Sequence, residues 1–241
     1  MAKMTLDDLV AQLRSAYGED LRAVVLYGSA AAGEHIPERS DTNVLVIVDR
    51  LDMETLGREA AVARGWADAG NPAPLTLTTE EWRGSADIFP MEYADILERH
   101  RVLHGEPPFD GIRVDGEHLR LQLENQALGK LLRLRQGILS AGGDGRRLVE
   151  LLAASLSTFM VILRGVARLH GEIPPTDYAE LTEGVARTAG FDPAPFLRVV
   201  RHVRGEAPLN AREAGDVITA YLSQVQRLVA HVNRIGPTRA S

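Results

Sequence analysis

Apolar and polar residues follow two different patterns along the first fifty of the 241 residues of this chain. From Thr5 to Tyr17 the apolar residues recur three and four positions apart, which predicts an amphipathic helix capped by Thr5. Leu21–Tyr27 and Asn43–Val48 are apolar on successive residues, as expected for strands that are covered on both faces. This region therefore predicts one helix followed by two buried strands.

Helices and strands are again predicted to alternate after the second strand. Asp52 to Ala69 has helical spacing, and a Gly-Asn-Pro sequence follows it. Leu75–Thr78 predicts a third strand, after which a short helix opens at Thr79. Ile88–Leu97 predicts a fourth strand that runs into a helix, and the Pro- and Gly-rich segment Leu103–Gly111 is the best candidate for a domain boundary.

No strand pattern remains after residue 116, where five helical segments follow with short Gly- and Pro-containing breaks. They are Glu117–Leu139, Arg146–His170, Asp177–Ala189, Pro193–Arg204 and Ala211–Arg234. Long helices with short breaks predict a bundle. We therefore expect an α+β protein, with a mixed sheet and flanking helices over residues 1–110 and an all-α helical bundle over residues 111–241.

Composition limits the cellular setting. The chain has 45% hydrophobic and 25% charged residues, as is ordinary for a soluble globular protein, and no cysteine. Disulfides and thiolate metal sites are therefore excluded, which fits a reducing compartment. The N-terminal segment lacks the apolar core of a signal peptide. The longest weakly polar run, Leu148–Leu163, is interrupted by Glu150 and predicts a buried helix. We expect a cytoplasmic protein with no membrane partner.

Charge is distributed unevenly along the chain. Residues 1–110 carry 10 Lys and Arg against 20 Asp and Glu, whereas residues 111–241 carry 17 against 13. An acidic half that holds cations beside a basic half that faces an anion is compatible with metal–nucleotide chemistry, although compositional drift explains it equally well. The absence of a strongly basic surface does not favour nucleic acid as a partner, and leaves it open.

The polar segment between the first two strands reads GSAAAGEHIPERSDTN from Gly28 to Asn43. A strand followed by Gly28, Ser29 and a turn of small residues can cradle phosphate, because glycine lets the backbone approach closely and serine donates a hydrogen bond. Asp41 comes twelve residues after Ser29, where the next strand begins. Because alternate strand residues share a face, two acids at positions 41 and 43 would bind Mg²⁺ together, but position 43 is Asn.

These residues resemble the nucleotidyltransferase superfamily of DNA polymerase β-like proteins. The likeness consists of Gly28-Ser29, then Gly33, then Ser40-Asp41 followed by an apolar strand. Two-domain members, in which a helical bundle accompanies the catalytic domain, are closest in layout. The resemblance implies a nucleotidyltransferase-like mixed sheet with flanking helices, followed by the bundle.

A more specific likeness is to an uncharacterised prokaryotic two-domain group of this superfamily with a C-terminal helical bundle. The shared pattern is GS-x-A-x-GE-x-x-P-x-x-SD-x-N, then a segment like Asp87–Ile96, then Val102-Leu103-x-Gly105 and an Arg-rich first bundle helix. It covers most of the chain, and its GS and SD core is the most specific part.

The resemblance implies a nucleoside triphosphate substrate, Mg²⁺ or Mn²⁺ as cofactor, and transfer of a nucleotidyl group to an unknown hydroxyl acceptor with release of pyrophosphate. By position, Gly28, Ser29, Gly33 and Ser40 would bind the nucleotide. Asp41 would be a metal ligand and a catalytic residue.

The match is incomplete where the family has further acids. The second metal ligand falls on Asn43, whose amide is a neutral and weaker oxygen ligand. The neighbouring strand Leu75–Thr78 has no carboxylate to activate the hydroxyl. Glu92 is our candidate for this catalytic role, with Asp95 and Glu124 as substitutes. The plainer interpretation makes Glu92 a solvated strand residue and Asp95 a charge near a helix N-terminus.

The remaining motifs give weaker evidence of function. Arg164 and His170 have the spacing of RNA-cleaving helical domains that partner minimal nucleotidyltransferases, a match that arises easily by chance. Arg99 to Arg101 is interpreted as a solvated helix face. The sequence contains no P-loop and no serine-hydrolase motif.

Two hypotheses of different class remain open. The first is an enzyme in which Asp41, Asn43 and Glu92 support nucleotidyl transfer. The second is a catalytically degenerate nucleotidyltransferase-like protein that acts as a nucleotide-binding regulator or a protein-interaction module. Asn43 favours the second, and the intact Gly-Ser cradle with Asp41 favours the first; a homo-oligomer is compatible with both.

Overall fold

The structure is a computed structural model that describes residues 3–31 and 42–236, apart from the side chain of Ser29. The chain divides into two compact units, Met1–Val114 and Asp115–Ser241. Each unit has its own secondary structure and its own buried side chains.

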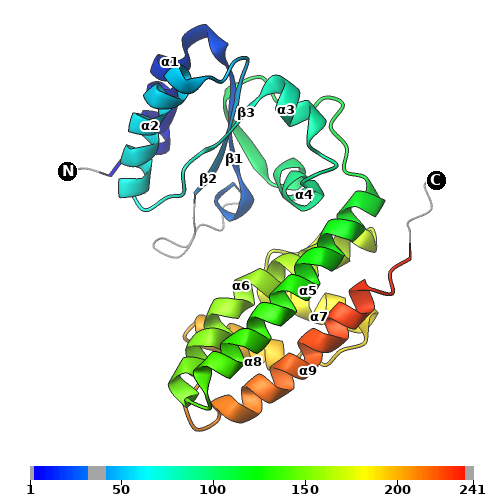
Figure 1. Ribbon diagram of the computed structural model, residues 1–241. Helices are drawn as coiled ribbons and strands as arrows, with labels where there is room; N and C mark the ends of the chain where they lie inside the picture. The colour runs from blue at the N-terminus through cyan, green and yellow to red at the C-terminus, as the bar shows by residue number, and fades with distance from the viewer. Residues whose placement is uncertain (1–2, 32–41, 237–241) are drawn as a thin grey trace. The chain divides into compact units, whose positions relative to one another are not determined.

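The N-terminal unit is built on a four-stranded mixed sheet in the order β3-β2-β1-β4 (Figure 1). The strands are β1 (Leu21–Tyr27), β2 (Asn43–Val48), β3 (Leu75–Thr78) and β4 (His100–Gly105). Strand β1 is antiparallel to both β2 and β4, and β2 is parallel to β3. The first three strands begin and end where the apolar patterns predict.

Helices cover both faces of this sheet (Figure 1). On one face lie α1 (Leu6–Tyr17) and α2 (Met53–Asp68), and on the other α3 (Thr79–Gly84) and α4 (Pro90–Glu98). Two short 3₁₀ helices, η1 (Gly18–Asp20) and η2 (Gly28–Ala30), flank β1. The two central strands are therefore buried on both sides, which explains why their sequences are apolar without alternation.

Side-chain caps fix where the helices of this unit begin. Thr5 and Asp52 each accept a hydrogen bond from the third helical residue, whose side chain in turn accepts from the cap backbone. Thr78 does the same for α3. Both long helices therefore start at the residue that the sequence indicates.

One buried carboxylate links three elements on the first face. Glu59 of α2 is 6% exposed and accepts hydrogen bonds from the hydroxyls of Tyr17 and Thr76, the latter at 2.5 Å. These bonds connect α2 to the end of α1 and to β3. Burying a carboxylate without hydrogen-bond partners raises the free energy of the folded protein. The hydroxyls of Tyr17 and Thr76 supply these partners to Glu59.

The prediction of a fourth strand within residues 88–97 is wrong. That segment forms helix α4, with Pro90 in its first turn, and the fourth strand is β4, which begins at His100. Arg99 to Arg101 is correspondingly not a helix face, since His100 and Arg101 are paired with β1. The cause is that β4 has only six residues and half of them are charged or polar, so its apolar signal is weak.

The C-terminal unit is a bundle of helices, as expected (Figure 1). They are α5 (Gly116–Ala141), α6 (Gly145–Leu169), α7 (Tyr178–Ala189), α8 (Ala194–Val203) and α9 (Ala214–Val232). Asp115, Asp144 and Asp177 cap the first three. In the core, the ring of Phe196 lies 4.6 Å from that of Tyr221 and 6.4 Å from that of Phe159.

Helix α6 contacts the other four helices of the bundle. By length and composition alone it is apolar enough to cross a membrane, and it is the one such helix within residues 3–31 and 42–236. Core helices of soluble proteins have the same property. Its buried stripe, which includes Leu152, Leu156, Phe159 and Leu163, accounts for its hydropathy by packing inside the bundle.

Candidate functional site

The candidate site begins where β1 ends. Gly28 follows Tyr27 and has a backbone φ of +78°, a left-handed conformation that favours glycine. Its N–H donates a hydrogen bond to the carbonyl of Arg99 at 3.0 Å, and its own carbonyl accepts from the N–H of Ala31 at 3.1 Å. The chain therefore leaves the sheet in a tight turn that other residue types disfavour.

Asn43 lies against this turn from the neighbouring strand. It is the first residue of β2 and pairs with Tyr27 of β1. A Cβ atom built on Gly28 would lie 3.5 Å from Asn43 Nδ2, so the amide packs on the bare face of the glycine. The turn after β1 and the start of β2 therefore lie side by side at this end of the sheet.

Carboxylates of α4 lie on the same face of the sheet. Tyr27 packs with the buried cluster beneath α4, and Asn43 shares that face because it alternates with Leu45. Burial raises the pKa of the Tyr27 phenol, and the nearby carboxylates of Glu92 and Asp95 raise it further. Both acids of α4 are therefore close to the end of β1 that leads into Gly28.

The secondary structure around Glu92 differs from the prediction. The residue lies in the first turn of α4 rather than in a strand, and its side chain is exposed. Asp95 lies one turn later on the same helix and is partly buried. The interpretation of Asp95 as a charge near a helix N-terminus is therefore wrong, because Asp95 is the sixth of the nine residues of α4 and the acid in the first turn is Glu92.

Several predicted site residues lie outside the part of the chain that the structure describes. These are Gly33, Ser40 and Asp41, together with the side chain of Ser29, whose backbone forms part of η2. Among the described residues, Asn43 packs on Gly28, and the carboxylates of Glu92 and Asp95 act on the neighbouring Tyr27.

The side chains at the Gly28 end of the sheet include the ligand types that a hard divalent cation prefers. Carboxylate and amide oxygens are the ligands that Mg²⁺ prefers, and Asn43 and Glu92 supply one of each. Among residues 3–31 and 42–236, no three His, Asp or Glu side chains converge closely enough to hold a metal ion. A complete site would accordingly need Asp41.

Glu124, the alternative candidate for the catalytic acid, pairs with a neighbouring residue on its own helix. Glu124 accepts a hydrogen bond from Arg120 at 3.0 Å, and Arg120 also binds Glu117 at 2.7 Å. All three residues lie on α5, where they form i, i+3 and i, i+4 ion pairs. This arrangement is that of a helix surface, which gives Glu124 a structural role.

Arg164 and His170 contact different residues. The guanidinium of Arg164 lies 5.8 Å from the ring centroid of Tyr178, whereas His170 Nε2 lies 3.1 Å from Nε2 of His231. The first contact is a cation–π pair, and the second joins the ends of α6 and α9. The two side chains therefore have separate partners within the bundle.

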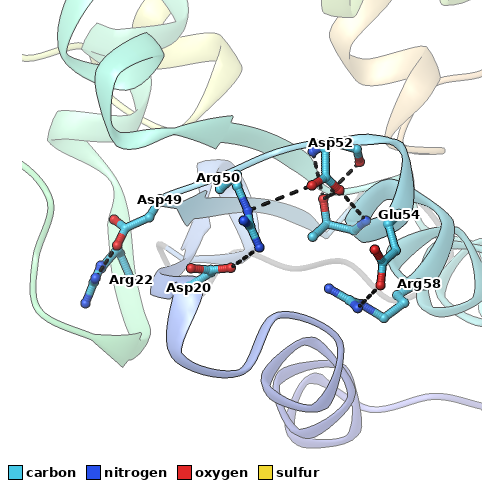
Figure 2. Close-up of polar contacts among 8 residues, drawn as sticks. Asp20, Arg22, Asp49, Arg50, Asp52, Glu54 and Arg58 are labelled. Carbon is cyan, nitrogen blue, oxygen red and sulfur yellow. Dashed lines mark hydrogen bonds and ion pairs between the residues drawn. The ribbon is translucent and has the colours of Figure 1, made fainter.

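A second charged cluster lies at the other end of the sheet, around the start of β1 and the end of β2 (Figure 2). Arg22 pairs with Asp49, and Arg50 lies between Asp20 and Asp52 at 3.7 and 3.8 Å. The hydrogen bond from Arg22 holds the pKa of Asp49 below its usual range.

A depression of about 640 Å³ opens beside the Arg22–Asp49 pair. Arg83 and His104 line it together with Glu106, so cationic and anionic groups face the same space. The carboxylates of the cluster have arginine or helix-cap partners, so they stabilise the local fold.

Sequence reasoning missed the part that Tyr27 plays. Its position directly before Gly28 was visible, but its closeness to Glu92 depends on how α4 packs on the face of the sheet that Tyr27 shares. This packing joins elements that are distant in the sequence, and a local pattern does not encode it.

The chain is similar in structure to the spectinomycin adenyltransferase AAD(9) from Enterococcus faecialis, which was solved with ATP and spectinomycin. The TM-score is 0.62, over 95% of this chain and 98% of that one, at 10% sequence identity. A likeness at this identity shows the fold, and it confirms the predicted nucleotidyltransferase-like α+β fold with a helical C-terminal region. No protein-family model matches the chain, and no curated protein matches it.

Proposed function

We propose that this protein binds a nucleoside triphosphate with Mg²⁺ or Mn²⁺ and transfers a nucleotidyl group to a hydroxyl acceptor, releasing pyrophosphate. The observation that carries the proposal is the left-handed turn at Gly28, packed against Asn43 at the start of the next strand. It occurs in a chain that shares its fold with an adenyltransferase solved with ATP.

The phosphates would bind along the turn that follows β1. Gly28 has no Cβ, so its backbone can approach an anion closely, and Ser29, Gly33 and Ser40 belong to the same segment of sequence. Backbone N–H groups and hydroxyls of such a turn donate hydrogen bonds to phosphate oxygens. These four residues would hold the terminal phosphates.

Asp41 and Asn43 would hold the divalent ion, one through a carboxylate oxygen and the other through an amide oxygen. When bound, the ion would neutralise charge on the phosphates and favour deprotonation of the attacking hydroxyl. An amide brings no negative charge, so this pair holds a cation less strongly than two carboxylates would.

Glu92 would take the proton from the acceptor hydroxyl. Its exposed carboxylate lies near Tyr27, on the face of the sheet that Asn43 shares. A general base must come within hydrogen-bonding distance of the proton that it removes, and an exposed side chain in the first turn of a helix has the freedom to do so. Asp95, one turn later, is the substitute.

A second function is favoured by one specific observation. Asn43 supplies an amide where the catalytic arrangement of this fold needs a second acid, so the protein would bind a nucleotide without turning it over. In that case it acts as a nucleotide-binding regulator or as a protein-interaction module. The two functions differ in turnover and agree on nucleotide binding.

Nucleotide binding is tested by isothermal titration calorimetry and thermal shift with each of the four ribonucleoside triphosphates, with and without Mg²⁺ or Mn²⁺. We expect stabilisation that requires the metal, and its loss in Asp41→Ala. Asp49→Ala is the matched control, because it removes an aspartate at the opposite end of β2. It should bind as the unmodified protein does.

The possible outcomes distinguish the enzyme from the regulator, and both from a wrongly placed site. Metal-dependent binding with pyrophosphate release supports the enzyme, and binding without release under any hydroxyl acceptor supports the regulator. If no triphosphate binds with either metal, both functions are rejected. If Asp41→Ala binds normally, the site has been placed at the wrong residues.

A further inference from the structure

Helix α5 carries apolar side chains on two opposite faces. One face packs inside the bundle. Its buried residues are Leu119, Leu123, Ala127, Leu131, Leu134 and Ala141. The other face exposes four leucines, Leu121 (50%), Leu128 (46%), Leu132 (47%) and Leu139 (80%). Exposed leucines in a row, rather than scattered singly, mark an interaction surface.

These four leucines, which we call the leucine stripe, form a symmetric pattern. Successive members are seven, four and seven residues apart, so the pattern reads the same in both directions about residue 130. At about 100° per residue they all project within roughly 20° of one line along the helix. The stripe extends over roughly 27 Å at 1.5 Å per residue.

We propose that the leucine stripe binds the same stripe of a second copy of this chain, with the two α5 helices antiparallel. A two-fold axis level with residue 130 then places Leu121 opposite Leu139 of the second copy, and Leu128 opposite Leu132. Every leucine of the stripe meets a leucine, as the self-complementary surface of a two-fold dimer requires.

Charges beside the stripe select the antiparallel arrangement. Glu124 and Arg135 lie on one flank of the stripe, and Asn125 and Gln136 lie on the other. The two-fold axis that relates antiparallel helices brings each flank against the same flank of the second copy. Glu124 then lies within about one residue rise, 1.5 Å along the axis, of Arg135 of the second copy.

The other flank is complementary as well, because Asn125 comes level with Gln136 of the second copy and their amides can form hydrogen bonds. In a parallel pair the unlike flanks meet, so Glu124 faces Asn125 and the charge pairing is lost. Arg135 is exposed and has no ion pair among the described residues, whereas Glu124 already accepts from Arg120. A carboxylate accepts several hydrogen bonds, so it can bind both arginines.

The orientation is tested by disulfide cross-linking in the full chain, which has no cysteine of its own. Leu121→Cys and Leu139→Cys are purified separately and oxidised alone or mixed. In the antiparallel dimer, position 121 lies roughly 27 Å from its own equivalent and opposite position 139. We therefore expect covalent dimers to form far more readily in the mixture than in either variant alone, because within the dimer a disulfide needs Cα atoms within about 7 Å.

The contact itself is tested by sedimentation velocity across a range of concentrations. We expect a concentration-dependent dimer, and a dissociation constant raised by about tenfold or more in Arg135→Glu, which places like charges across the seam. Adding Glu124→Arg restores opposite charges and should restore the affinity. Arg133→Glu makes the same charge change on the same helix away from the stripe and should have no effect.

Three results would overturn the proposal. The first is an unmodified chain that stays monomeric at every concentration. The second is a covalent dimer that forms as readily with Leu121→Cys alone as in the mixture, which the antiparallel arrangement does not predict. The third is a double variant, Arg135→Glu with Glu124→Arg, that dimerises no better than the single one. None of these measurements depends on nucleotide binding, so the dimer proposal can be rejected without affecting the proposed function.

Discussion

At the scale of single residues, the chemistry proposed for this protein depends on the side chain at position 43. Asn43 packs on Gly28 through its amide, and an aspartate has nearly the same size and shape. Replacing the amide by a carboxylate therefore changes the charge at the turn while leaving the packing almost as it was. This makes the position a direct probe of how much negative charge the site needs.

We expect Asn43→Asp to raise metal-dependent pyrophosphate release by about tenfold or more, because a second carboxylate binds the cation more strongly. The measurement is the rate of release from each triphosphate at saturating Mg²⁺. Asn71→Asp is the control, since it adds the same charge in the loop after α2, away from the site. A rate that rises in neither variant would contradict the prediction that a carboxylate at position 43 increases metal-dependent turnover.

At the scale of elements, Gly105 shows how strand β4 is held in the sheet. It is the last residue of β4, has a φ of +78° and pairs with Ala23 of β1. A Cβ built at this position would lie 1.9 Å from the carbonyl oxygen of Arg22, which is backbone and cannot move aside. The close approach of two backbones, in addition to the left-handed φ, requires glycine here.

Gly105→Ala should therefore destabilise the N-terminal unit by more than its φ alone explains. Gly111 has the same φ of +78°, but a methyl group added there would meet no atom within 4 Å, so Gly111→Ala carries only the conformational cost of about 1–2 kcal/mol. We expect Gly105→Ala to cost about 2 kcal/mol more, as overpacking does. Urea unfolding measures the free energy of unfolding of both variants. An equal loss of stability in the two would contradict the steric argument.

The contact between α6 and α9 carries a pH dependence. Burial lowers the pKa of His231, and the charges of His170 and Arg234 lower it further. The folded protein therefore binds a proton at His231 less readily than the unfolded chain, whose pKa is near 6.5. Stability from this group is complete above that value and falls as the pH drops below it.

His231→Gln should accordingly lose less thermal stability than the unmodified protein between about pH 7.5 and pH 5.5, because glutamine does not titrate. Glutamine can still form a hydrogen bond with His170, so the contact is kept. His118→Gln is the control, since His118 lies on α5, away from this contact. A pH profile in His231→Gln that matches that of the unmodified protein would contradict the assignment.

Most elements could be predicted because each has a local signal. Caps at Thr5, Asp52 and Asp177 and unbroken helical spacing set the helices, and the apolar runs set the first three strands. The Glu59 hydrogen bonds to Tyr17 and Thr76 had no such signal, because the partners come together only in the folded sheet. Contacts of this kind depend on tertiary packing.

The candidate site was predictable in outline for the same reason. Gly28 and Asn43 stand in one short segment of sequence, and their contact follows from the pairing of adjacent strands. Glu92 could be named as an acid but not placed, since its segment was assigned to a strand and forms a helix. Its closeness to Tyr27 arises from how α4 packs on the sheet.

At the scale of the whole molecule, the chain consists of two units that each have their own core. The boundary lies between Val114 and Asp115, and Asp115 itself caps the first helix of the bundle. Each unit thus contains the residues that fix its own helix ends and its own buried clusters. A unit with these properties can fold without the remainder of the chain.

We therefore expect residues 115–241, expressed alone, to form a helical bundle that unfolds cooperatively on heating. Circular dichroism measures both properties. Residues 145–241 are the control, because without α5 the buried faces of α6 and α9 lose the side chains of Leu123 and Leu131. This shorter fragment should unfold without cooperativity, since removing a core helix exposes the apolar surface that it covered. A longer fragment that is equally uncooperative would show that the bundle requires the N-terminal unit to fold.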